Sequence, residues 1–178
     1  MSKTIKLYEN SSYISKFNAT VTDCIKVEED DRFHGIYTYK AVLDKTAFYP
    51  EGGGQPSDRG SITLIHRSAS THNPALKNIT VSAVNETNGI IYHYISAPFS
   101  AGDSVECKID WDFRFMLMQH HTGEHIVSGL INRHFGFNNV GFHMGENYVT
   151  VDIDGKLTQE DLDFIEISAN NTVQKNLG

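Results

Sequence analysis

The first part of the chain consists of short β-rich segments, each ending at residues that favour turns. Asn88-Gly89 separates two of these segments and is a strong signal for a two-residue hairpin. Because β-branched and aromatic residues dominate them, the segments are typical of an all-β barrel or sandwich. We therefore predict a β-domain over residues 1–110. Its predicted strands cover residues 5–8, 19–27, 35–43, 61–65, 79–84, 90–95 and 105–109.

Helical spacing begins after residue 110. Residues 113–134 contain no proline and place apolar side chains three and four positions apart, which predicts a helix with Asp112 as its N-cap. Residues 140–153 contain a stretch that alternates with period two and predict a β-hairpin. The whole chain is therefore predicted to be an α+β protein.

A second helix is predicted to begin after Thr158, which forms a capping box with Asp161. Residues 111–178 thus contain helix, hairpin and helix. A two-stranded hairpin is marginal by itself, so we expect this α/β unit to be incomplete and the chain to be a piece of a longer protein. The apolar positions expected to face a core on the second helix are Leu162, Ile165, Ala169 and Val173.

Composition and charge exclude several classes of protein. No apolar run approaches the roughly 20 residues that cross a bilayer, and the N-terminus lacks a secretion signal, so we expect no membrane partner and a cytoplasmic location. The formal net charge of −7 argues against a broad basic groove, so any nucleic acid must be bound locally. Cys24 and Cys107 form no C-x-x-C pair and are expected to be reduced core residues.

His121 and His125 are the first candidates for chemistry. Four residues apart on a helix, they lie about 40 degrees apart, close enough for both imidazoles to reach one metal ion. Two ordinary, partly buried histidines satisfied by hydrogen bonds remain an equally open interpretation. The zinc protease signature needs a glutamate directly after the first histidine, but Thr122 stands there and Glu124 precedes His125 instead.

A glycine-rich bend is the second candidate. It places Thr46 and Gln55 on either side of Tyr49-Pro50-Glu51 and three successive glycines, of which Gly53 and Gly54 are candidates to contact a ligand. Glycines allow positive φ and close approach of another backbone, while neither a phosphate loop nor a dinucleotide fingerprint is present. A tight connection between strands stays open as the simpler interpretation.

Together the bend and the His121-Thr122-Gly123-Glu124-His125 motif closely resemble the editing region of alanyl-tRNA synthetases and of free-standing alanyl-tRNA editing proteins. The resemblance covers nearly the whole chain. It implies an N-terminal barrel like those of translation factors, followed by the α/β editing fold shared with threonyl-tRNA synthetases. It also implies hydrolysis of the ester in a tRNA for alanine that carries serine or glycine.

The resemblance further implies roles for individual residues. His121 and His125 match two zinc ligands, whereas the Cys and His of a later C-x-x-x-H motif do not occur in this sequence. We therefore expect weak or no zinc binding, and an inactive chain unless it is part of a longer protein. Thr46 matches the residue that recognises the serine hydroxyl, with Gln55 nearby as a catalytic and substrate-binding candidate. Glu124 is a catalytic candidate or a group that supports the metal ligands.

A noncatalytic module that docks tRNA or a protein partner is the alternative function. Both hypotheses use the same barrel and helix, and they differ in whether the histidines and the bend form a working site.

Overall fold

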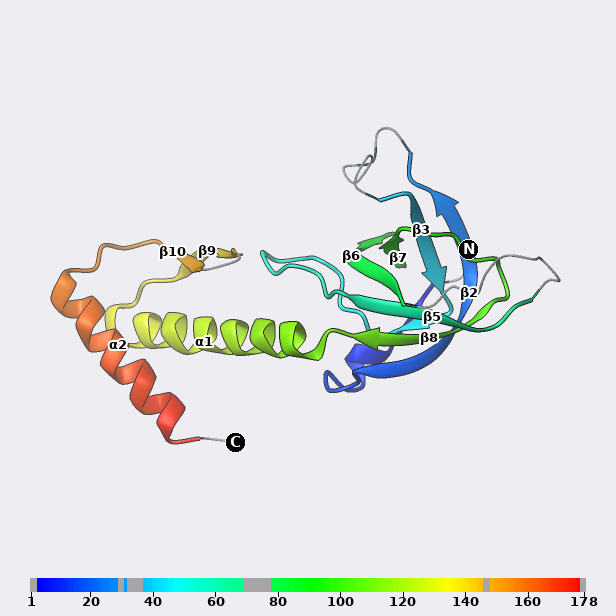
Figure 1. Ribbon diagram of the computed structural model, residues 1–178. Coiled ribbons are helices and arrows are strands. Elements are labelled where there is room, and N and C mark those ends of the chain that lie inside the picture. Colours follow the sequence, from blue (N-terminus) through cyan, green and yellow to red (C-terminus); the bar gives the residue numbers. More distant parts are fainter. Residues whose placement is uncertain (1–2, 29–30, 32–36, 69–77, 146–147, 177–178) are drawn as a thin grey trace. The chain divides into compact units, whose positions relative to one another are not determined.

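A computed structural model describes residues 3–28, 31, 37–68, 78–145 and 148–176 (Figure 1). The chain divides into two compact units. The first comprises Met1–Gly52 and Pro56–Arg114, and the second comprises Gly53–Gln55 and Phe115–Gly178. The sequence prediction placed the division between residues 110 and 111, and it did not anticipate that Gly53–Gln55 belongs to the second unit.

The first unit contains a closed barrel with strand order β2-β3-β7-β6-β5-β8, in which all neighbouring strands are antiparallel. The predicted β-barrel and the α+β class are therefore confirmed. A short parallel pair of β1 with β4 accompanies the barrel. The strands are β1 (Ile5–Lys6), β2 (Lys16–Lys26), β3 (Tyr39–Leu43), β4 (Lys45–Thr46), β5 (Gly60–His66), β6 (Ile79–Thr87), β7 (Ile90–Ile95) and β8 (Ser104–Ile109).

Alternate residues of each barrel strand point inward, and apolar residues occupy most of these positions. Val21, Ile62 and Val105 are fully buried there, and removing such side chains from water is the main favourable term in folding. Cys107 also belongs to this core, and both cysteines are free. The buried members of the core are Ala19, Val21, Ala41, Leu43, Ala47, Phe48, Ile62, Val81, Val84, Ile91, Ile95, Phe99, Val105, Cys107 and Ile109.

The predicted hairpin at Asn88-Gly89 is confirmed. Thr87 pairs with Ile90, and both turn residues have positive φ, 53° for Asn88 and 78° for Gly89. This is the backbone of a type I′ turn, whose twist matches that of the flanking strands.

The second unit contains most of helix α1 (Trp111–Phe135), the antiparallel hairpin of β9 (Asn139–Met144) and β10 (Val149–Ile153), and helix α2 (Gln159–Gln174). The predicted order of helix, hairpin and helix is confirmed. Thr158 caps α2 as predicted, since its side chain accepts from the Asp161 N–H and the Asp161 carboxylate accepts from the Thr158 N–H.

Two local predictions were wrong. Asp112 does not cap α1: the helix begins at Trp111, and the carboxylate of Asp110 accepts a hydrogen bond from the Phe113 N–H at 3.3 Å. The cap lies earlier because β8 runs directly into the helix, leaving Asp110 as the last non-helical residue. The strand predicted over residues 5–8 ends at Lys6, and Leu7–Glu9 form a 3₁₀ turn. In the strand predicted over residues 35–43, residues 35 and 36 lie outside the described part.

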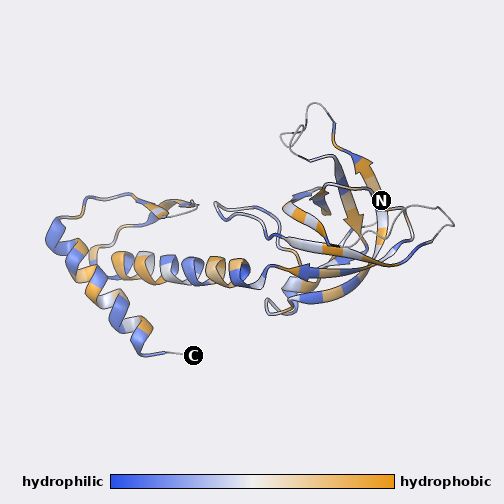
Figure 2. Ribbon diagram, viewed as in Figure 1, coloured by the Kyte–Doolittle hydropathy of each residue, from blue (hydrophilic) through white to orange (hydrophobic). Residues whose placement is uncertain are grey.

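Helix α2 buries less than its sequence pattern predicts. Of its residues only Ile165 is buried, whereas Leu162 and Val173 are exposed. Figure 2 shows hydrophilic residues over much of this helix, with hydrophobic residues at intervals. Within the described residues, no helix is long and apolar enough to cross a membrane.

Candidate metal and substrate site

The two candidate metal ligands lie together on α1. The Nε2 atoms of His121 and His125 are 3.1 Å apart, and their ring centroids are 4.8 Å apart. Helical geometry produces this proximity, because residues four apart lie on one face of a helix. The prediction that both imidazoles can reach one point is therefore consistent with the structure.

The other ring nitrogen of each histidine faces an oxygen. Nδ1 of His121 lies 2.6 Å from Oε1 of Gln55, and Nδ1 of His125 lies 3.3 Å from Oε2 of Glu124. A carboxamide oxygen only accepts a hydrogen bond, so Nδ1 of His121 carries the proton and Nε2 of His121 presents a lone pair. The contact of His125 with Glu124 is an ion-pair distance and does not fix the tautomer of His125. Nε2 of His121 can therefore accept a proton from Nε2 of His125 or face a cation that lies between the two nitrogens.

Glu124 is buried, whereas the neighbouring side chain of His125 is 68% exposed. The Oε1 atom of Glu124 accepts a hydrogen bond from Asn139 Nδ2 at 2.6 Å, and Oε2 faces His125. Both carboxylate oxygens are thus engaged. This environment suits orientation of the histidine better than proton abstraction from a substrate.

The glycine bend explains how Gln55 reaches His121. Gly54 has φ +81°, and a Cβ atom there would collide with the carbonyl oxygen of Phe142. The Gly54 carbonyl also accepts a hydrogen bond from the Met144 N–H at 2.9 Å. Only glycine fits this close pairing of the bend with β9. Gly53 also has positive φ, +58°, but no atom lies within 4 Å of the place that a Cβ would take there.

Thr46 lies in the barrel unit and is buried. Its Oγ1 atom lies 2.8 Å from Nε2 of His93 and accepts a hydrogen bond from the Phe48 N–H at 3.1 Å. Burial lowers the pKa of His93 to about 4, although its contact with the Ala41 carbonyl opposes this shift. The imidazole is therefore neutral near pH 7.

Sequence reasoning missed His93. A usable signal existed, because His93 shares the period-two register of Ile91 and Ile95, and all three are fully buried. A histidine at an inward position of a barrel strand must find hydrogen-bond partners inside the protein.

Arg114 connects the start of α1 to the segments that flank the bend. Its guanidinium donates to Asp58 through Nε, at 2.7 Å to Oδ1, and through Nη2, and it also donates to the carbonyls of Ala47 at 2.7 Å and Ser12 at 2.8 Å. Asp58 in turn accepts from the Tyr49 N–H at 2.7 Å. This buried pair fixes the backbone of the barrel unit on both sides of the glycines.

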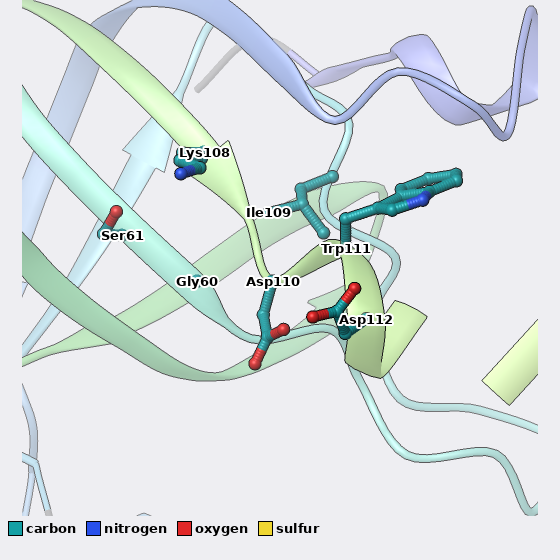
Figure 3. Close-up of a pocket in the computed structure, with 7 residues that line it drawn as sticks. All are labelled: Gly60, Ser61, Lys108, Ile109, Asp110, Trp111 and Asp112. Carbon is teal, nitrogen blue, oxygen red and sulfur yellow. The ribbon is translucent and has the colours of Figure 1, made fainter. Parts of the chain in front are cut away.

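A pocket of about 450 Å³ lies where β8 passes into α1 (Figure 3), but it contains none of the predicted site residues. Figure 3 shows Asp110, Trp111 and Asp112 at this start of the helix, with the indole of Trp111 pointing away from the Asp110 carboxylate. Asp110 already forms an ion pair with Arg59 at 2.7 Å. These features describe the helix start better than a catalytic centre.

A zinc ion usually takes four protein ligands in a structural site and three in a catalytic site. The histidine pair fits two of these positions, because both Nε2 atoms point to the same place. Within the part of the chain that the structure describes, no group of three His, Cys, Asp or Glu residues could hold a metal ion. Cys107 lies in the barrel core, where burial raises the pKa of its thiol, so it is not poised as a thiolate ligand.

Residues 2–113 match the family described as tRNA synthetases class II (A), and the chain belongs to this family. Together with the relatives described next, this match confirms the resemblance predicted from the glycine bend and the histidine motif.

Individual relatives share nearly the whole of this chain. It is 29% identical to the alanyl-tRNA editing protein Aarsd1 of Rattus norvegicus over 177 residues, which cover 96% of this chain and 40% of the relative. It is 28% identical to the alanyl-tRNA editing protein AlaX-L of Pyrococcus horikoshii, covering 97% of this chain and 39% of that one. An alanine–tRNA ligase of Natronomonas pharaonis is 35% identical, covering 98% and 18%. The chain thus spans about two fifths of the length of the editing proteins it matches.

Proposed function

We propose that this chain contributes to hydrolytic editing of mischarged tRNA for alanine, with the ester of serine or glycine as the bond that is cleaved. Its membership of the synthetase family and its likeness to proteins named for alanyl-tRNA editing support this function. In this proposal the barrel is of the translation-factor type, and the second unit is the first part of an α/β editing domain.

The observation that carries the proposal is the pairing of His121 with His125. Their Nε2 atoms are 3.1 Å apart, and each ring has its Nδ1 atom beside an acceptor oxygen. Because Gln55 holds the proton of His121 on Nδ1, the Nε2 lone pair of His121 is directed at the point where Nε2 of His125 lies. Two ligands of one cation need this arrangement, in which both Nε2 atoms face the same point.

Zinc is the cation that best suits this site, with His121 and His125 as two of its ligands. A bound zinc ion would lower the pKa of a coordinated water or polarise the ester carbonyl. Gln55 and Glu124 act on the histidines: the Gln55 amide oxygen keeps the proton of His121 on Nδ1, so that its Nε2 is free to bind, and the Glu124 carboxylate lies beside Nδ1 of His125. With only two ligands among the described residues, we expect zinc to bind this chain weakly.

Selection of the wrong amino acid is assigned to the region of Thr46. A pocket built for alanine cannot strongly reject an analogue that only adds a hydroxyl, whereas a second pocket that hydrogen-bonds this hydroxyl can select it. Thr46 supplies the oxygen for that bond. Gly53 leaves open space for a ligand beside Gln55, whereas Gly54 packs against the Phe142 carbonyl. The partner is the aminoacylated end of the tRNA, because a net charge of −7 does not favour broad contact with phosphates.

The test is hydrolysis of seryl-tRNA for alanine by the protein as its gene encodes it. His121→Ala and His125→Ala should each lower the rate about 100-fold or more, because each removes a metal ligand. His66→Ala is the matched control, since His66 is exposed on β5 and should leave the rate unchanged. If the protein binds the seryl-tRNA but does not hydrolyse it, the docking function is correct and the editing proposal is wrong.

Thr46→Val tests selection separately from catalysis. The variant keeps the shape of the side chain and removes its hydroxyl, so hydrolysis of seryl-tRNA should fall more than hydrolysis of glycyl-tRNA. Equal losses for the two substrates would remove Thr46 from the selective role.

A further inference from the structure

His93 is a buried titratable residue that the proposed chemistry does not use. It lies on β7, is fully buried and packs edge-on against Phe48, with ring centroids 5.5 Å apart. Its neighbours in the register are Ala41 on β3 and Val84 on β6. A histidine enclosed in this way keeps its place only if both ring nitrogens are paired.

The partners of His93 determine where its proton lies. Nδ1 is 3.1 Å from the carbonyl oxygen of Ala41, and a carbonyl oxygen can only accept. Nδ1 therefore carries the proton of the neutral ring, and Nε2 is an acceptor. The Thr46 hydroxyl, 2.8 Å from Nε2, must then donate its proton to the histidine.

The same hydrogen bonds determine which hydrogen-bonding capacity of the Thr46 hydroxyl stays free for a ligand. Its proton is given to His93, and one of its two lone pairs accepts from the Phe48 N–H at 3.1 Å. One lone pair is left. A ligand hydroxyl that reaches this oxygen can form a hydrogen bond only by donating its own proton.

We propose that His93 is a positioning residue that makes Thr46 a hydrogen-bond acceptor only, so that the site selects amino acids with a donating hydroxyl. The inference rests on the proposed function, in which Thr46 contacts the misloaded amino acid. Serine supplies a donor, whereas glycine and alanine do not. Without His93, the Thr46 hydroxyl rotates freely and can donate its proton to another acceptor in the barrel. The oxygen is then no longer presented to the ligand in one orientation.

The first experiment measures the histidine directly and needs no catalytic activity. Long-range ¹⁵N–¹H spectra of the chain labelled on histidine nitrogens should show His93 as the neutral tautomer with the proton on Nδ1. In Thr46→Val the Nε2 resonance should shift because its donor is lost, and in Thr46→Ser it should stay close to that of the unmodified chain. A proton on Nε2 in the unmodified chain would overturn the proposal.

The second experiment compares hydrolysis of seryl-tRNA and glycyl-tRNA by the protein as its gene encodes it. His93→Leu should lower the ratio of the seryl rate to the glycyl rate about 10-fold, the equivalent of one hydrogen bond. His93→Gln, whose amide oxygen can accept from Thr46, should restore most of the ratio. In the Thr46→Val background, His93→Leu should not change the ratio further.

The two experiments distinguish the possible failures. If His93→Leu slows both substrates equally and His93→Gln does the same, His93 is a structural residue and the inference is wrong. If the unmodified protein hydrolyses neither substrate, the proposed function fails together with the selective role of His93, while the spectra still decide the orientation of the Thr46 hydroxyl.

Discussion

The two units of this chain differ in how many polar side chains they bury: among the described residues most of these lie in the barrel unit, with Glu124 in the second. The barrel buries polar groups and pairs them, as Thr46 with His93 and Asp58 with Arg114 show. The second unit leaves apolar side chains in contact with solvent: Phe164 and Ile167 on α2 are exposed. A closed sheet has no unpaired edge and encloses one core, so it can hold buried polar pairs in a single geometry.

The difference corresponds to a division of tasks between the units. The hydrogen bond of the Thr46 hydroxyl to His93 requires exclusion of water, and it lies in the barrel. The histidine pair lies in the second unit, where His125 is accessible and lies beside Glu124, while Gln55 orients His121 from the bend that pairs with β9. We therefore expect the barrel to lose the most stability when a buried polar group loses its partner. We expect the second unit to be destabilised when a residue no longer fits the local backbone.

The largest effect is expected for Asp58→Asn. This change leaves the Arg114 guanidinium buried without its carboxylate and should lower the free energy of unfolding of the barrel by about 3–5 kcal/mol. Asp110→Asn is the matched control: it breaks the exposed pair with Arg59 and should cost at most about 1 kcal/mol. Urea unfolding followed by fluorescence of Trp111, the single tryptophan, measures both. Equal losses would contradict the contrast between buried and exposed pairs.

A somewhat smaller effect is expected from pH. The pKa of His93 is lowered from 6.5 to about 4 by burial, so the unfolded chain binds a proton more readily than the folded one between these values. The contribution of neutral His93 to the free energy of unfolding is fully present above about pH 6.5. It is lost as the pH drops towards 4, by about 3 kcal/mol in total. His93→Gln should remove this part of the pH dependence, measured by urea unfolding at pH 7, 5.5 and 4.5. An unchanged pH dependence in the variant would show that other groups cause it.

The smallest effect is expected in the second unit. Gly54→Ala places a Cβ against the Phe142 carbonyl at a positive φ and should weaken the pairing of the bend with β9 by about 1–3 kcal/mol. Gly52→Ala is the control, because no atom lies within 4 Å of a Cβ there and its φ is not positive. Hydrogen exchange of the Met144 amide, which donates to the Gly54 carbonyl, reports the pairing directly. Equal exchange rates in both variants would argue against this role of Gly54.

Much of the fold was predictable because it depends on neighbours in the sequence. Period-two alternation located the strands, Asn88-Gly89 located a hairpin, and Thr158 with Asp161 located the start of α2. The predictions failed where an element had to meet another element. Asp110 and not Asp112 caps α1, because β8 continues directly into the helix.

Part of the candidate site was also predictable. Helical spacing alone placed His121 beside His125, and the triple glycine marked a bend with unusual backbone angles. Spacing could not show that Gln55 bonds to His121, or that Gly53–Gln55 belongs to the second unit. The period-two register marked His93 as an inward position, but its partners, Thr46 and the Ala41 carbonyl, could not be predicted because they are distant from it in the chain.

The sequence by itself determined the elements, the turn residues and the pairing of the two histidines, because the preferences of the backbone act over one to four residues. The tertiary structure decided which hydroxyl donates a hydrogen bond to His93, which oxygen orients His121 and which carboxylate is buried beside Arg114. These choices join residues that lie far apart along the chain. Such partners meet only when packing encloses them, and a buried polar group must then take the nearest acceptor or donor that the fold supplies.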